Sequence, residues 1–193
     1  MSHISSVAEE ALHLYDDCQY AAAVPLLIAA SVEGCAEAQF CLAECYAMGN
    51  GVQQDAVTAL QWYEQSAGLG YPDAQNTTGV CYEKGNGCVQ NPAKAVYWYV
   101  LAARQGDVCA QFNLAECYRK GVGVEVSPEQ AVEWYKKAAD QGHFWAQYYL
   151  AQAYETGEGT VKSSALAVYW YRTAYSDHHL YEAELALKRL GVL

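Results

Sequence analysis

The distribution of apolar and polar residues predicts a chain built of short amphipathic helices. Ala59, Trp62, Tyr63 and Ser66 stand at positions i, i+3, i+4 and i+7, so they share one stripe of a helix that ends near Gly70. A preceding stripe at helical spacing is formed by Ala38, Leu42, Ala43 and Tyr46. A polar, glycine-containing loop separates the two stripes, so they predict a pair of consecutive helices.

The helix pair recurs with a period of 36 residues. The sequence AVEWYKKAADQG, which begins at Ala131, returns as AVYWYVLAARQG, ALQWYEQSAGLG and, in altered form, AVYWYRTAYSDH. Its tryptophans are Trp62, Trp98, Trp134 and Trp170. A fixed period of this size is typical of repeat proteins, in which each unit buries its apolar face only against its neighbours. The Trp-Tyr pair is therefore predicted to be a packing element, with Trp98 and Trp134 largely buried.

The 36-residue frame divides the chain without gaps. Full units are predicted at residues 36–71, 72–107, 108–143 and 144–179. Residues 1–35 are expected to form a degenerate N-terminal helix pair, and residues 180–193 resemble half a unit that forms a C-terminal capping helix. Tyr175 and His178 replace the usual Ala and Gly, which indicates that the array relaxes near its end. We expect one continuous all-α solenoid domain.

Helix boundaries are marked at the same places in each unit. A residue that favours the N-cap position precedes the second helix in all four units, namely Asp55, Asn91, Ser127 and Ser163. Pro92 and Pro128 follow directly, at the first helical position, where proline is tolerated. The inter-helix loops carry Gly-x-Gly pairs such as Gly49 and Gly51. Because no strand precedes them and no Lys-Ser/Thr follows, they predict left-handed helix ends rather than phosphate-binding loops.

Composition and charge indicate an ordered protein with protein partners. Hydrophobic residues make up 53% of the chain and charged residues 17%, which favours a folded core. The net charge of −11 disfavours nucleic acid and anionic membranes as partners, because both are bound through Lys and Arg. No apolar run approaches the roughly 20 residues needed to span a bilayer. Residues 1–20 contain four acids and no Lys or Arg, unlike a signal peptide, so we expect a cytoplasmic protein with neutral or basic partners.

The eight cysteines predict packed, reduced thiols, with disulfides as the alternative. Cys45, Cys81 and Cys117 share one frame position, where the fourth unit has Ala153, so a small buried side chain explains the pattern. No Cys-x-x-Cys pair occurs, and we therefore expect no metal site. Cys88 lies in a loop and is predicted to be the most reactive thiol.

Catalytic motifs are absent from the sequence. It contains no Gly-x-Ser-x-Gly, and its five histidines do not recur with a cysteine and an acid in a way that suggests a triad. We therefore expect a protein that is not an enzyme and needs no cofactor. An unrecognised hydrolase remains an alternative, because groups distant in sequence can meet in the folded chain.

The recurring motif carries a family resemblance. The pattern A-x-x-x-L-A-x-x-Y-x-x-G-x-G-V, a polar loop and then A-x-x-W-Y-x-x-A-A-x-x-G over residues 36–179 resembles the Sel1-like repeat, a relative of the tetratricopeptide repeat. The resemblance implies a right-handed superhelix of antiparallel helix pairs, common in bacteria, that acts as an adaptor or scaffold. Thr78 departs from the motif, where it replaces Leu. Some secreted, cysteine-rich relatives hold each helix pair with a disulfide.

The resemblance also implies a binding surface, since first helices line the concave wall in tetratricopeptide relatives. When the positions that face the groove in those relatives are matched to the 36-residue repeat, the implied partner-binding residues are Phe40, Glu44, Asn76, Phe112, Glu116, Arg119, Lys120, Trp145, Tyr148 and Gln152. The aromatic residues are expected to be apolar anchors, and Arg119 and Lys120 are expected to select an acidic group of the partner. The alternative is that the rings merely pack between adjacent first helices. The convex wall, with Tyr97 and Glu133, is expected to be neutral for binding.

The leading hypothesis is a non-catalytic protein-protein interaction module whose groove binds a peptide or protein. A dedicated inhibitor or immunity-type protein for one partner is the first alternative, and the hydrolase is the second. The sequence leaves the oligomeric state open.

Overall fold

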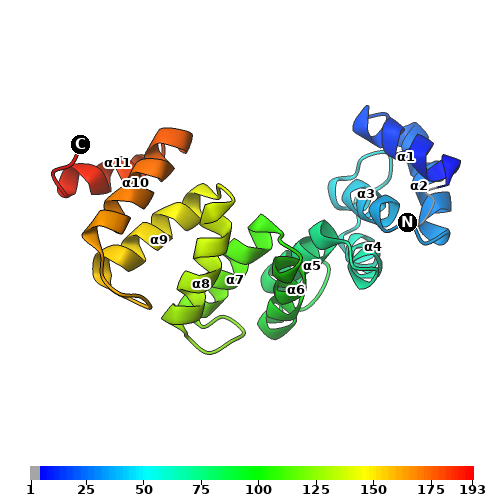
Figure 1. The fold of residues 1–193 in the computed structure, drawn as a ribbon. Helices are drawn as coiled ribbons and strands as arrows, with labels where there is room; N and C mark the ends of the chain where they lie inside the picture. The colour runs from blue at the N-terminus through cyan, green and yellow to red at the C-terminus, as the bar shows by residue number, and fades with distance from the viewer. Residues whose placement is uncertain (1–4) are drawn as a thin grey trace. The chain divides into compact units, whose positions relative to one another are not determined.

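The computed structural model describes residues 5–193, apart from the side chains of residues 177 and 178, and every regular element in this range is a helix (Figure 1). The helices are α1 (Ser6–Asp16), α2 (Tyr20–Val32), α3 (Ala36–Met48), α4 (Ala56–Gly68), α5 (Pro72–Lys84), α6 (Pro92–Arg104), α7 (Val108–Lys120), α8 (Pro128–Asp140), α9 (Phe144–Thr156), α10 (Ser164–His178) and α11 (Tyr181–Arg189). Helices that follow one another pack together, as α3 does with α4 and α8 with α9. The prediction of an all-α helical-repeat fold is confirmed.

The chain divides into two compact units, residues 1–102 (unit 1) and residues 103–193 (unit 2), with the boundary inside α6. The expected N-terminal helix pair corresponds to α1 and α2, and residues 1–4 lie outside the described part of the chain. Each unit has its own apolar core, formed by the facing stripes of its helices.

The caps predicted from the sequence fix the ends of the second helices. The Asp55 side chain accepts hydrogen bonds from the backbone N–H groups of Val57 and Thr58. The backbone N–H of Lys94 donates to Asn91 Oδ1 at 3.0 Å, and Ser127 and Ser163 accept in the same way from the residues three positions later. α6 and α8 begin at Pro92 and Pro128, as predicted. These side chains satisfy N–H groups that a helix start would otherwise leave unpaired.

The two glycines of each inter-helix loop have different structural roles. Gly49, Gly85, Gly121 and Gly157 end the first helices in the left-handed conformation, as predicted. The second glycine lets the loop approach an earlier helix closely. A Cβ on Gly87 would lie 2.1 Å from the Ala56 carbonyl oxygen, and one on Gly159 would lie 2.3 Å from that of Pro128. Side chains are therefore excluded at Gly51, Gly87 and Gly159 by contact with backbone.

A buried glutamine joins each repeat to the one before it. The side-chain Nε2 of Gln39 donates to the Ser31 carbonyl oxygen at 2.9 Å, across the turn that links α2 to α3. The equivalent bonds run from Gln75 to Ala67, from Gln111 to Ala103 and from Gln147 to Ala139. Each glutamine thus satisfies a carbonyl near the end of the preceding second helix, where intrahelical donors run out.

The Trp-Tyr pair fills the core with its tyrosine. Tyr63, Tyr99, Tyr135 and Tyr171 are at most 3% exposed, whereas the tryptophans before them are half-buried. Trp98 and Trp134 are therefore partly buried at the edge of the core, and the tyrosine that follows each is the fully buried member of the pair. In α4 the buried residues are Ala59, Leu60, Tyr63, Ser66 and Ala67. This stripe is centred on Tyr63 and leaves Trp62 at its margin.

The C-terminal end departs from the regular repeat as its sequence suggested. The position that is Gly142 in the preceding repeat is His178 here, so no glycine ends the helix. α10 continues to His178 and is 15 residues long, whereas the other repeat helices have 13. His179 then takes the left-handed conformation, with φ of 51°. α11 covers the last core through buried Ala183, Ala186 and Leu187.

Candidate protein-binding surface

Half-buried aromatic side chains of α7 and α9 gather around the buried Tyr135 of α8 in unit 2. Tyr149 of α9 stacks on Tyr135 of α8, with ring centroids 5.5 Å apart, and lies 6.2 Å from Phe112 of α7. Trp145 and Tyr148 extend the group along α9, because both rings contact Tyr149. Phe112, Trp145, Tyr148 and Tyr149 are half-buried, so each packs on a neighbour and still shows part of its ring to solvent.

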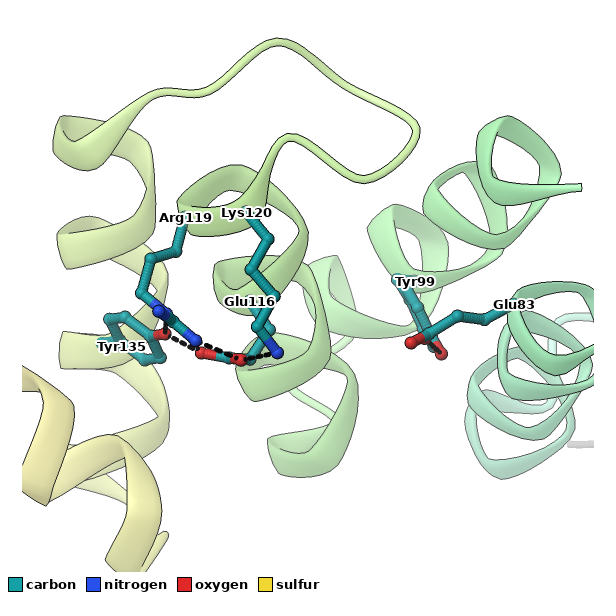
Figure 2. A network of polar contacts seen from close by, with 6 residues as sticks. All are labelled: Glu83, Tyr99, Glu116, Arg119, Lys120 and Tyr135. Carbon is teal, nitrogen blue, oxygen red and sulfur yellow. Dashed lines mark hydrogen bonds and ion pairs between the residues drawn. The ribbon is translucent and has the colours of Figure 1, made fainter.

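Charged side chains of α7 form a network beside these rings (Figure 2). Arg119 binds Glu116 through two nitrogens, each 2.8 Å from a carboxylate oxygen, and Lys120 Nζ lies 2.5 Å from Glu116 Oε2. The Tyr135 hydroxyl donates to Glu116, and Arg119 Nε donates to the Tyr135 oxygen at 3.1 Å. The guanidinium carbon of Arg119 also lies 4.9 Å from the centre of the Tyr149 ring.

The network strongly favours the ionised form of Glu116. Burial alone would raise the pKa of this carboxyl, but hydrogen bonds from Arg119, Lys120 and Tyr135 outweigh burial and lower the pKa to about 2. The hydrogen bond to Glu116 raises the pKa of Arg119. Burial, reinforced by the bond to Glu116, raises the pKa of Tyr135. At neutral pH the cluster therefore holds one carboxylate, two cations and an uncharged phenol.

A cleft of about 370 Å³ opens beside the network within unit 2. Its walls include Arg119, Tyr135, Tyr149, Gln152, Glu155 and Arg189. Arg189 of α11 is held by Glu155, with Nη2 at 2.7 and 2.6 Å from the two carboxylate oxygens. Gln152 Nε2 donates to the Tyr148 hydroxyl at 2.9 Å. The walls of the cleft therefore combine aromatic rings with polar side chains that are already held by hydrogen bonds or ion pairs within the chain.

The sequence-predicted residues fall into two groups. Seven of them lie in unit 2, namely Phe112, Glu116, Arg119, Lys120, Trp145, Tyr148 and Gln152. Phe40, Glu44 and Asn76 lie in unit 1 and are half-buried there. The Phe40 ring lies 5.7 Å from that of Tyr63 and 5.4 Å from that of Tyr71, so it packs on neighbouring helices as well as facing solvent.

Arg119 and Lys120 already have an acidic partner within their own helix. Both were expected to select an acidic group of a partner, yet both are ion-paired with Glu116 of their own helix. The Glu116 side chain is 15% exposed, so it is the inner member of the cluster, and the two cations cover it. An acidic partner would have to compete with this carboxylate for either cation.

Sequence reasoning missed the partners of the buried tyrosines. Each donates its hydroxyl to a glutamate on the first helix of the same pair, in the pairs Tyr63–Glu44, Tyr99–Glu83, Tyr135–Glu116 and Tyr171–Glu155. Figure 2 shows the second and third of these pairs. Glu44 and Glu116 share one frame position, whereas Glu83 and Glu155 stand three residues later, about one helical turn. Each repeat carries Glu at only one of these two positions. This pattern is visible in the sequence and could have predicted the tyrosine partners.

The thiols and the remaining chemistry give no second site. None of the eight cysteines is disulfide-bonded in the structure, and burial raises the pKa of Cys41 to about 12 and those of Cys45 and Cys81 to about 11. Burial also raises the pKa of Cys88, which disfavours its thiolate, the reactive form of a thiol. Within the described residues, no three metal-ligating side chains cluster, and none of the helices is long and apolar enough to cross a membrane.

The fold and the surface define a helical-repeat protein of the kind that binds other proteins. The profile of the Sel1 repeat matches residues 36–71, 72–107, 110–143 and 146–179, so the chain belongs to the Sel1 repeat family. Members of this family generally serve as protein-interaction modules and are generally non-catalytic. No curated protein matches the chain.

Solved structures support the family assignment. A Sel1 repeat protein from Oxalobacter formigenes is 30% identical, with a TM-score of 0.83 over 89% of this chain and 74% of its own. A protective antigen of uropathogenic Escherichia coli strains is 36% identical, with a TM-score of 0.78 over 80% of this chain. The match spans only 33% of that antigen's length. An immunity protein from Pseudomonas aeruginosa, 24% identical with a TM-score of 0.55 over 90% of this chain and 68% of its own, shares the fold.

Proposed function

We propose that the chain is a non-catalytic adaptor or scaffold that binds a peptide or protein segment on the aromatic surface and cleft of unit 2. The observation that carries the proposal is the group of half-exposed rings, Phe112, Trp145, Tyr148 and Tyr149, beside a cleft of about 370 Å³. Aromatic residues that expose part of a fixed ring supply contact area at little cost in conformational entropy. Phe40, Glu44 and Asn76 remain proposed contacts on unit 1.

The ion pairs at the cleft indicate how specificity would arise. Arg119 and Arg189 are held in fixed positions by Glu116 and Glu155, so their remaining donors are oriented before a partner arrives. Because each cation is already neutralised, these groups should orient a partner through their remaining donors more than they add affinity. The net charge of −11 supports a protein partner rather than nucleic acid.

The test begins with partner capture by the full chain and continues with quantitative binding of the captured protein. Tyr149→Ala and Trp145→Ala should each weaken binding by more than about 2 kcal/mol if the rings are anchors. Tyr169→Ala is the matched control, because Tyr169 lies in α10 of the same unit, is 57% exposed and does not line the cleft. Circular dichroism checks that each variant folds. Loss of binding in Tyr169→Ala, with Tyr149→Ala unaffected, would place the site elsewhere.

A dedicated inhibitor or immunity-type protein for one partner is the second candidate. Its support is the fold shared with immunity proteins from Pseudomonas aeruginosa, at 24% and 22% identity. Capture of one dominant protein whose activity is blocked by the chain would favour this candidate, whereas several partners with unchanged activity would favour the adaptor. Eight cysteines without a disulfide support the proposed cytoplasmic location, because the cytoplasm is a reducing compartment.

A further inference from the structure

The outer face of α2 lacks the charged and polar residues that every later second helix carries at some of the corresponding positions. α2 has the sequence YAAAVPLLIAASV and contains no charged residue. Six of its residues are exposed and all six are apolar, namely Ala21, Ala22, Pro25, Ile28, Ala29 and Val32. At 100° per residue they occupy about a third of the helix circumference. We call this set the α2 stripe. A helix that is apolar all round is normally covered.

Comparison with α8 shows that the α2 stripe is not required by the repeat. α8 has the same length and lies 108 residues, or three repeats, further along the chain. The residues that correspond to the α2 stripe there are Glu129, Gln130, Glu133, Lys136, Lys137 and Asp140, all polar and all exposed. The inner face of α2 still packs on its neighbours through Ala23, Val24, Leu27 and Ala30. The fold therefore needs only one apolar face of this helix, and the second face is unexplained by packing within unit 1.

Charge around the α2 stripe has one sign. All eleven Lys and Arg residues of the chain lie at or beyond Lys84, whereas half of the 22 acidic residues precede it. Asp16 and Asp17 are exposed directly before α2, and Glu33 is exposed directly after it. His13 Nδ1 lies 3.4 Å from Asp17 Oδ2. Both ends of the α2 stripe are therefore flanked by carboxylates.

We propose that the α2 stripe docks an amphipathic helix of a partner protein whose apolar face is flanked by Lys or Arg. The apolar residues supply a surface for helix packing, and the carboxylates at both ends select cations. A second copy of this chain fits poorly, because an antiparallel pair of α2 helices would bring Glu33 of one copy towards Asp16 and Asp17 of the other. An anionic lipid surface is repelled by the same carboxylates. This site is separate from the cleft proposed above, which lies in unit 2.

The experiment uses the full chain and a fluorescent synthetic peptide of about 18 residues, or five helical turns, with a leucine stripe flanked by lysines. Fluorescence anisotropy should show saturable binding that weakens as salt rises. Ile28→Glu combined with Val32→Glu should weaken binding at least about tenfold, or 1.4 kcal/mol. Val89→Glu is the control, because Val89 is an 88% exposed residue of unit 1 outside the α2 stripe, and its affinity should be unchanged. Hydrogen exchange should locate new protection at residues 20–32.

Several results would overturn the proposal. Equal binding by the double variant would show that the α2 stripe is not the binding site. Equal binding of a peptide with glutamate flanks would show that the carboxylates do not select cations. A concentration-dependent dimer that the double variant abolishes, without peptide binding, would assign the face to a second copy. Binding to anionic vesicles in place of the peptide would assign it to lipid. Tyr149→Ala, which tests the cleft of unit 2, should leave binding of this peptide unchanged. Failure of the α2 proposal can therefore be told apart from failure of the cleft proposal.

Discussion

The network around Glu116 provides a prediction whose size follows from the structure. A fall in the pKa from 4.5 to about 2 corresponds to about 3 kcal/mol in favour of the ionised carboxylate. Its partners Arg119 and Lys120 are 38% and 53% exposed, so solvent screening reduces this value. We therefore expect Glu116→Gln to lower the free energy of unfolding by about 1–3 kcal/mol at pH 7. Urea denaturation followed by circular dichroism measures the change.

The pH dependence of the Glu116 effect has a definite sign. Because the pKa of the folded state is lowered, the stabilisation is present above the unfolded value of 4.5 and is lost as pH falls towards 2. Glutamine does not ionise, so the Glu116→Gln variant lacks this pH-dependent part of the free energy of unfolding. The difference between wild type and Glu116→Gln should therefore shrink from pH 4.5 downwards and be small near pH 2.

Glu83 offers a matched control for Glu116. It accepts a hydrogen bond from the Tyr99 hydroxyl at 2.6 Å, and no ion pair to its carboxylate is recorded among the described residues. A glutamine can still accept the hydroxyl, so Glu83→Gln should cost less than about 1 kcal/mol. If Glu116→Gln costs no more than this control, or if its cost does not change with pH, the network does not stabilise the fold as argued.

Three further predictions concern the core, the loops and the thiols. Tyr99→Ala should cost about 3–5 kcal/mol in urea denaturation and Trp98→Ala clearly less, because the tyrosine is fully buried and the tryptophan only partly; equal costs would contradict the burial described. Gly87→Ala should lower the thermal midpoint more than Gly142→Ala. Both have positive φ, but a Cβ meets backbone only at Gly87, so Gly142→Ala bears only the left-handed strain of about 1–2 kcal/mol. Dithiothreitol should leave Tm unchanged, and the denatured, unreduced chain should titrate eight thiols; fewer would reveal disulfides.

The sequence predicted the helices well because their signals are local. N-caps such as Asp55 and left-handed glycines such as Gly49 act within one turn of the residue that carries them. The choice between Trp62 and Tyr63 depends on where the buried stripe is centred, and both satisfy the same helical spacing. Only the packing of neighbouring helices decides between them.

The candidate surface was predictable in part. The frame placed Phe112 and Tyr148 on first helices, where the structure has them half-buried. Tyr149 and Arg189 were missed, since one stands beside a predicted residue and the other belongs to the terminal helix outside the 36-residue frame. The pairing of Arg119 with Glu116 follows i, i+3 spacing and was available from the sequence.

The glutamine bonds between repeats also bear on how the chain folds. Each bond joins residues only eight positions apart, as between Gln39 and Ser31, so it closes a very short loop at a small entropic cost. The described bonds of helix pairs and joints lie within one repeat or between adjacent repeats, such as that of Tyr63 with Glu44, and the lack of more distant pairing favours rapid folding. Folding can begin at any joint and spread to its neighbours, and under mechanical load the chain should come apart one helix pair at a time.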